Sequence, residues 1–182
     1  MKRCKTCREP FVPRLPMQAV CSPECALSHA VSTRGKQQKR EQIAERKADK
    51  QKRERLKSKS DWARETQTQF NAYIRLRDDA EPCISCGRYH GGQYHAGHFL
   101  SVGARPELRF EPLNVHKQCA PCNSHLSGNI VLYRQGLIKR IGLQLVEWME
   151  GPHEAKKYTV EDLQSIKSEY ASKVRQMKKD ME

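Results

Sequence analysis

Apolar residues recur at roughly helical spacing in two stretches around the middle of the chain. The first predicts a helix from about Asp61 to Arg77, with an apolar stripe formed by Trp62, Phe70, Tyr73, Ile74 and Leu76. The second follows the cysteine-rich centre and is formed by Leu132, Leu137, Ile141, Leu145 and Trp148. Gly136 and Gly142 interrupt this second stripe, so we expect a broken helix or a helix pair there.

A further helix is predicted near the end of the sequence, after Gly151-Pro152 stops the previous one. Thr159 is a suitable N-cap, and Asp162 three residues later completes an imperfect capping box. The apolar side of this helix consists of Leu163, Ile166, Tyr170 and Val174. Such a stripe can dock on the same chain or on a second copy, so a homodimer stays open.

The segment from Arg34 to Lys59 has no such stripe. It holds 12 basic and 4 acidic residues, a net charge of +8, and its Lys, Arg, Gln, Glu and Ala content favours a helix without a buried face. Two interpretations stay open, a solvated linker and an arm that follows DNA phosphates. If the segment is an arm that follows DNA phosphates, its candidate DNA contacts are Lys50, Lys52, Arg53 and Arg55.

Composition narrows the class of partner. The 182 residues carry 34 Lys and Arg against 21 Asp and Glu, a net charge of +13, which favours a polyanion and nucleic acid first. No run of 18 apolar residues exists, so we expect no membrane span. The start MKRCKTCREP has no apolar stretch, so we expect no cleaved signal peptide and reduced thiols.

Eight cysteines form four close pairs, which predicts two tetrahedral Cys4 zinc sites rather than free cysteines in small cores. The first site takes Cys4, Cys7, Cys21 and Cys25, and the second takes Cys83, Cys86, Cys119 and Cys122. Residues 1–30 would form a small finger stabilised by its metal, with Ser22 and Pro23 at a helix start. The expected parts are the finger (1–30), a basic helical arm or linker (31–60), a zinc-bearing central domain (61–150) and a C-terminal helix (151–182).

The central segment carries candidate chemistry. His98 is followed by 15 residues and Asn114, then by eight residues and Asn123, with the cysteine pairs Cys83/Cys86 and Cys119/Cys122 bracketing the set. This spacing resembles the HNH family of metal-dependent nucleases. The resemblance implies an α+β fold, namely a small zinc-stabilised ββα-metal domain with flanking helices, added to the N-terminal Cys4 finger.

The resemblance also implies a role for each of the three residues. A neutral imidazole suits a general base near pH 7, and His98 takes that position. Asn114 would hold a backbone or the imidazole in place. Asn123 would offer an amide oxygen to Mg²⁺ or Mn²⁺, which stabilises the leaving group.

A closer resemblance covers nearly the whole chain. The basic two-finger layout and four local motifs are similar to the NinG recombination proteins of lambdoid phages, also called Rap: Ala96-Gly97-His98, Leu108-Arg109-Phe110, Asn114-Val115-His116 and Cys122-Asn123-x-His125-x-x-Gly128-Asn129. It implies a structure-specific endonuclease for branched DNA such as D-loops and Holliday junctions, in the cytoplasm of a bacterial host. Host or phage recombination proteins would be its partners.

One position departs from the HNH pattern. Many members carry a metal-binding Asp just before the base, where this chain has Gly97. The substitute ligand is predicted to be His116, which shares a strand face with Asn114, with His125 and then His95 as alternatives. Basic residues around this site are candidate phosphate contacts, although a solvated face explains them equally well: Arg105, Arg109, Lys117, Arg134, Lys139 and Arg140.

Two function classes follow from the sequence. The first is a metal-dependent DNA endonuclease, and the second is a non-catalytic DNA-binding zinc protein that recruits recombination factors. Charge and zinc fit both, whereas the spacing of His98, Asn114 and Asn123 is explained only by the nuclease. The missing acidic ligand at Gly97 favours the second class. An RNA-binding ribbon protein is a third reading, which needs the cysteine pairs but not His98.

Overall fold

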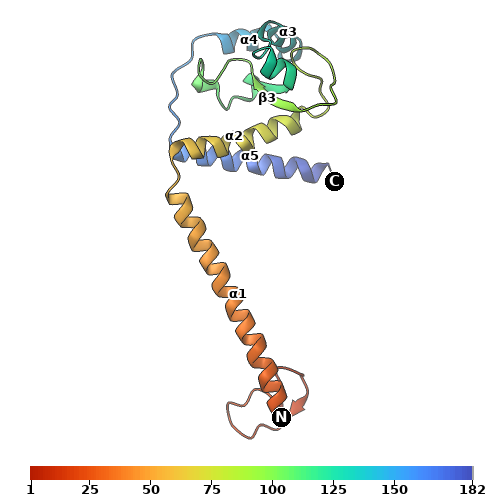
Figure 1. Cartoon of the computed structure of the whole chain (residues 1–182), viewed down its shortest axis with the longest axis vertical. Helices are drawn as coiled ribbons and strands as arrows, with labels where there is room; N and C mark the ends of the chain where they lie inside the picture. Colours follow the sequence, from red (N-terminus) through yellow and green to blue (C-terminus); the bar gives the residue numbers. More distant parts are fainter. Residues whose placement is uncertain (182) are drawn as a thin grey trace. The chain divides into compact units, whose positions relative to one another are not determined.

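The computed structural model describes residues 1–181, and the chain divides into two compact units, one spanning Met1–Lys57 and one beginning at Ser58. It mixes helices with two small antiparallel sheets, one in each unit (Figure 1). Within residues 1–181, no helix is both long and apolar enough to cross a membrane.

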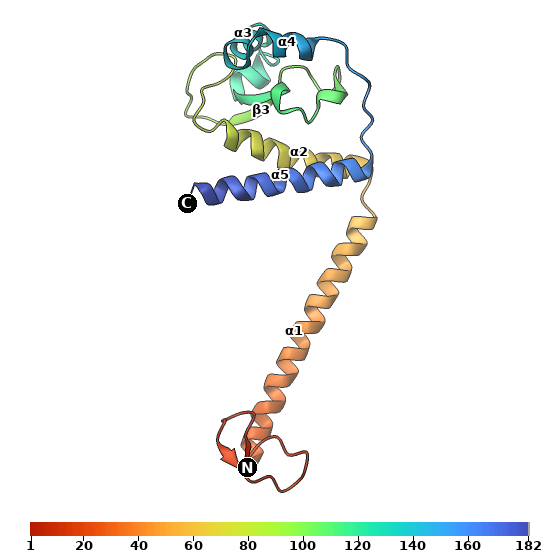
Figure 2. The same ribbon diagram turned by 180° about the vertical axis from the view of Figure 1, so that it is seen from behind.

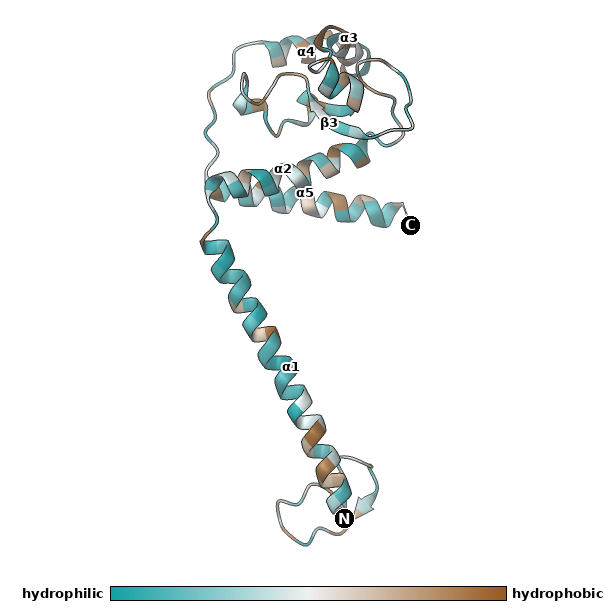
Figure 3. Ribbon diagram, in the orientation of Figure 1, coloured by the Kyte–Doolittle hydropathy of each residue, from teal (hydrophilic) through white to brown (hydrophobic). Residues whose placement is uncertain are grey.

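The first unit consists of a small hairpin and one long helix. Strands β1 (Lys2–Arg3) and β2 (Pro10–Phe11) pair, and α1 (Pro23–Arg55) follows. The predicted start is confirmed, because Ser22 Oγ accepts a hydrogen bond from the Cys25 backbone N–H at 3.3 Å and Pro23 opens the helix. No residue of α1 is buried, and Figure 3 shows it hydrophilic along most of its length. The basic segment is therefore a helix without a buried face, as its composition predicts.

The second unit wraps helices around the other hairpin. Its longer elements are α2 (Lys59–Arg77), β3 (Tyr94–His98), β4 (Val115–Cys119), α3 (Ile130–Ile141), α4 (Leu143–Glu150) and α5 (Val160–Asp180). Three short turns of helix complete it: η1 (Pro106–Leu108), η2 (Pro112–Asn114) and the π-helix η3 (Pro121–His125). Both views in Figures 1 and 2 show α2 and α5 side by side.

The hairpin register decides which side chains share a face. Strands β3 and β4 are antiparallel, and Gly97 lies opposite His116 while His98 lies opposite Val115. Because side chains alternate along a strand, Gly97 and His116 face one side of the hairpin and His98 and Val115 face the other.

Each face of the hairpin contacts its own hydrophobic core. Val115 packs into a cluster with side chains of α2 and α5, and Phe70 of α2 meets Tyr170 of α5 edge to face at 4.8 Å. The second cluster lies against α3 and α4: Ile84, Phe99, Leu108, Tyr133, Leu137, Val146 and Met149. The apolar stripe of α5 therefore docks on the same chain. Its predicted capping box is present, since Thr159 and Asp162 exchange hydrogen bonds.

The predicted break after the centre occurs at one of the two glycines. Gly142 has a φ of 87° and separates α3 from α4, which confirms the expected helix pair. Gly136 instead lies inside α3, where a Cβ atom would collide with the backbone oxygen of Ile84. The missing side chain lets α3 approach the turn between Cys83 and Cys86, so Gly136 brings elements together rather than interrupting a helix.

Candidate metal and catalytic site

The eight cysteines gather into the two expected clusters. In each cluster the four sulfur atoms lie within 4.8 Å of one another, and all eight are free thiols. Cys4, Cys7, Cys21 and Cys25 form the cluster of the first unit, and Cys83, Cys86, Cys119 and Cys122 form that of the second. Four converging sulfurs suit tetrahedral zinc, so each cluster could hold one ion.

Both clusters begin with the same turn. The Arg8 N–H donates to the Cys4 carbonyl at 3.0 Å, and the Gly87 N–H donates to the Cys83 carbonyl at 2.9 Å. Arg8 and Gly87 have φ values of 65° and 66°, a left-handed conformation that glycine adopts without strain. The sequence of the second turn fits this geometry better than that of the first.

The thiols within each cluster shift one another's pKa values. Burial raises the pKa of Cys4, but backbone N–H groups that point at its sulfur outweigh this and bring the pKa to about 6. The neighbouring thiols, Cys7 first, raise the pKa of Cys21 to about 12, and burial with its cysteine neighbours does the same to Cys119. Four thiolates therefore coexist only when a bound cation offsets their repulsion.

His90 is not among the residues predicted from the sequence, yet it lies beside the second cysteine cluster. Its Nε2 lies 3.2 Å from the Cys86 sulfur, and its backbone N–H donates to the Tyr94 hydroxyl at 2.6 Å. A ring N–H directed at a thiolate stabilises the negative charge. The four-residue separation from Cys86 is the only sequence signal for this contact.

His98 ends β3 with its imidazole anchored on one side. Nε2 lies 2.9 Å from the Arg109 carbonyl oxygen, which can only accept, so the proton is on Nε2 and Nδ1 is the basic nitrogen. Burial, and to a smaller extent the Arg109 guanidinium, lowers the pKa of His98 below its usual 6.5, although the bond to the carbonyl opposes this. The ring is therefore neutral at pH 7 and able to accept a proton.

Asn114 holds the loop that connects the two strands. It is fully buried at the end of η2, and its Oδ1 accepts from the Leu100 N–H at 2.8 Å. Its Nδ2 donates to the carbonyls of Leu100 and Leu108 at 3.0 and 3.1 Å. Every polar atom of the amide is thus used within the loop, which fits the expected positioning role.

Asn123 and Gly97 lie against each other. Asn123 belongs to η3, and a Cβ atom on Gly97 would lie 2.9 Å from its Oδ1 and would collide with Gln118 Oε1. The place of an aspartate side chain at position 97 is therefore occupied by the amide of Gln118. Gln118 is not among the residues predicted from the sequence, because strand alternation is the only signal that places it on the face of Gly97.

The three histidines weighed as substitute ligands lie in different environments. His116 is buried next to Tyr133, with ring centres 6.3 Å apart, and burial lowers its pKa to about 3. His125 is exposed on η3, and His95 is half-buried opposite Gln118. Within residues 1–181, only the two cysteine clusters bring three or more Cys, His, Asp or Glu ligand atoms together. The role of the three histidines as metal ligands stays a prediction.

The candidate phosphate contacts fall into two groups. On α1, four basic residues are exposed: Lys50, Lys52, Arg53 and Arg55. Near the hairpin, Arg105 donates to the carbonyls of Glu150 and Gly151, and Arg109 donates to Gln67 Oε1. Lys117 is buried and donates its ammonium to the Asp79 carbonyl at 2.7 Å. These intramolecular bonds account for the second group without DNA, and DNA contact stays a prediction for both.

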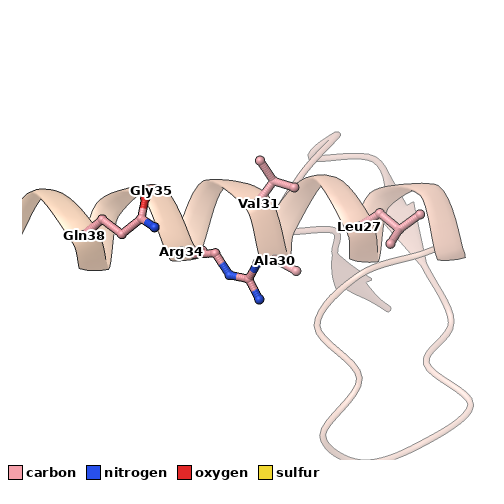
Figure 4. A pocket seen from close by; sticks show the side chains of 6 residues that line it. All are labelled: Leu27, Ala30, Val31, Arg34, Gly35 and Gln38. Carbon is pink, nitrogen blue, oxygen red and sulfur yellow. The ribbon is translucent and has the colours of Figure 1, made fainter.

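One hollow does not coincide with this chemistry. It measures about 500 Å³ and lies along α1, lined by Leu27, Ala30, Val31, Arg34, Gly35 and Gln38. All six residues come from one helix, and Figure 4 shows Val31 and Arg34 pointing to different sides of it. No polar groups converge there, so we place the candidate site at the hairpin end instead.

Comparison with known proteins identifies the family. The family model described as Bacteriophage Lambda NinG protein matches residues 1–182. The protein ninG of Salmonella phage P22 is 40% identical, and the alignment covers 97% of this chain and 94% of the relative. The protein ninG of Escherichia phage lambda is also 40% identical, with 97% and 93% covered. No solved structure matches the chain. The matched length and identity show that this chain belongs to the NinG family.

Proposed function

We propose that this protein is an HNH-type, metal-dependent endonuclease that cleaves branched DNA. The observation that carries the proposal is the state of His98, a neutral imidazole with Nε2 bound to a carbonyl and Nδ1 left as the base. The substrate class, D-loops and four-way junctions, follows from the resemblance to NinG recombination proteins.

In this mechanism, His98 accepts a proton from the attacking water at Nδ1. The Arg109 carbonyl holds the ring and stabilises the proton on Nε2 as charge develops. Asn114 fixes the loop that carries Arg109 by bonding to the backbone at Leu100 and Leu108. Arg109 and Asn114 thus orient His98 at the end of the strand.

The residues around Gly97, which precedes His98 in the chain, fit a hard divalent cation. Asn123 presents Oδ1 beside Gly97, one residue from the base, and an amide oxygen is a ligand that Mg²⁺ and Mn²⁺ accept. When bound there, the ion would stabilise the negative charge of the leaving oxygen. The Cys83 cluster contributes structure, because its cysteines precede β3 and flank the start of η3.

The test is cleavage of labelled linear, D-loop and four-way DNA by zinc-loaded protein with Mg²⁺ or Mn²⁺. Wild type should cut branched DNA, and His98→Ala should lose at least 100-fold in rate while it binds the same DNA, since general base catalysis contributes about that much. His29→Ala, on α1, is the matched control and should cut like wild type. Binding without cleavage by wild type would support the recruiting protein instead.

A further inference from the structure

We infer that Gln118 is the second protein ligand of the catalytic cation and replaces the aspartate that position 97 lacks. Its Oε1 and Asn123 Oδ1 both lie next to the position that a Cβ atom of Gly97 would occupy, where they would form a pair of amide oxygens. This inference rests on the proposed function, and it adds a residue that the HNH pattern does not contain.

The orientation of the Gln118 amide is fixed by its nitrogen. Nε2 donates to the Gly128 carbonyl at 2.6 Å and to Ser85 Oγ at 2.7 Å. A carbonyl oxygen can only accept, so the nitrogen must face Gly128, and the oxygen must face Gly97. Gly128 follows η3 and Ser85 lies between two cysteines, which ties the amide to the metal-binding turn and to the helix of Asn123.

Within residues 1–181, the side-chain oxygen of Gln118 has no hydrogen-bond partner. The residue is fully buried, and Oε1 is among the few buried polar atoms of residues 1–181 without a hydrogen bond. Such an acceptor destabilises the fold when it is left unsatisfied. A cation bound between Gln118 and the half-buried Asn123 would satisfy it and would reach the site from the Asn123 side.

The identity of the ligands has a consequence for binding. Two amide oxygens carry no net charge, whereas most Mg²⁺ sites rely on carboxylates or substrate phosphates. The negative charge must therefore come from the DNA, so the ion should bind weakly to free protein and more tightly together with a phosphate. The glycine at position 97 leaves the space that Gln118 uses.

The experiment is a Mn²⁺ titration of zinc-loaded, full-length protein bound to a short DNA, with DNA alone as the blank and free Mn²⁺ measured by electron paramagnetic resonance. Gln118→Ala should weaken Mn²⁺ binding about tenfold or more, because loss of a metal-supporting group has effects of that size. Gln93→Ala changes an exposed glutamine immediately before β3 and should bind like wild type. Equal affinity of Gln118→Ala and wild type, or no Mn²⁺ binding by wild type, would overturn the inference.

A swap of positions separates lost coordination from lost packing. Gly97→Asp with Gln118→Ala places a carboxylate in the space that the glutamine vacates, so this double variant should recover Mn²⁺ binding. Gly97→Asp alone should lower the melting temperature, because its Cβ collides with Gln118. Failure of the double variant to bind better than Gln118→Ala would contradict shared coordination.

Cleavage assays on the same variants distinguish this inference from the proposed function. If wild type binds Mn²⁺ through Gln118 but cuts no DNA, the nuclease assignment fails and the metal site stands. If wild type cuts junctions and Gln118→Ala binds Mn²⁺ and cuts equally well, the ligand assignment fails and the nuclease stands.

Discussion

His98 has a lower pKa than a free histidine because its ring is largely buried and lies near the Arg109 guanidinium. A base must be unprotonated to act, so activity should be full above the folded-state pKa and should fall as the pH drops through it. We predict that kcat/KM on a four-way junction, measured from pH 5 to 8 with Mg²⁺, keeps its plateau to below pH 6.5. An acid limb centred at or above pH 6.5 would show that another group controls cleavage.

The other members of the motif do different work with the same type of side chain. Asn114 uses its amide on backbone groups of the connecting loop, whereas Asn123 directs its oxygen to Gly97. The structure thus separates a positioning amide from a candidate ligand. Burial is the difference, since Asn114 is fully buried and Asn123 is partly exposed.

At the scale of elements, a buried ion pair joins α2 to the hairpin. Arg77 donates to both carboxylate oxygens of Asp78, at 2.7 and 2.9 Å, and also to the carbonyls of Pro112 and Val115. The Lys117 backbone N–H donates to Asp78 Oδ2 at 2.9 Å. The end of α2 is therefore fixed to β4 and to the turn that carries Asn114.

This connection gives a pH-dependent prediction. Burial raises the pKa of Asp78, but Arg77 and the Lys117 N–H outweigh it and lower the pKa below 3.8. A depressed carboxyl pKa stabilises the fold above the unfolded value and loses that effect as the pH falls through the folded value. Asp78→Asn should cost about 3 kcal/mol at pH 7, as loss of one partner of a buried pair does. The difference from wild type, measured by urea unfolding, should shrink below about pH 4.

The neighbouring carboxylate provides the control for this prediction. Asp79 is exposed, so Asp79→Asn should change the free energy of unfolding by no more than about 0.5 kcal/mol. If the free energy of unfolding of Asp78→Asn differs from that of wild type by the same amount from pH 7 to pH 3, the cause is a packing effect instead of the ion pair.

Elements with local signals were predictable from the sequence, and contacts between elements were not. Ser22 and Thr159 are caps whose partners lie three residues away, and Gly142 breaks a helix through its own φ value. By contrast, Gly136 matters because Ile84 approaches it from another element, and the orientation of Gln118 depends on Gly128. No periodicity in one segment reports which distant backbone will approach it.

At the scale of the whole molecule, the two cysteine clusters lie in separate units. We predict two zinc ions per purified chain, because each cluster provides four sulfurs that require a cation to ionise together. Cys119→Ser should lower the content to one zinc and unfold the second unit, since its small core depends on the metal. Elemental analysis and circular dichroism measure the two effects.

The reciprocal variant is the control for zinc content. Cys4→Ser should also leave one zinc but should keep the second unit folded, with unchanged heat unfolding of its aromatic core. Wild type with fewer than two zinc ions, or one variant that empties both clusters, would contradict independent sites.

Charge is the other property that belongs to the whole molecule. The segment from Arg34 to Lys59 accounts for a net +8 out of +13, and α1 buries none of its residues. Four exposed basic residues near its end, Lys50, Lys52, Arg53 and Arg55, were singled out for DNA contact. If α1 binds DNA, its contribution is phosphate neutralisation, because it offers long cationic side chains and no packed surface.

Salt dependence measures this contribution directly. Each neutralised phosphate changes the slope of log affinity against log salt by about −0.9, so replacement of the four residues by Gln should reduce the slope magnitude by about 3 to 4. Linear and branched DNA should be affected alike, because phosphate contacts carry no sequence information.

The control replaces four exposed basic residues of α5 by Gln and should leave the slope unchanged: Lys173, Arg175, Lys178 and Lys179. An unchanged slope for the α1 variant would show that this helix is a solvated linker, whereas a loss confined to junctions would show that it reads branch geometry.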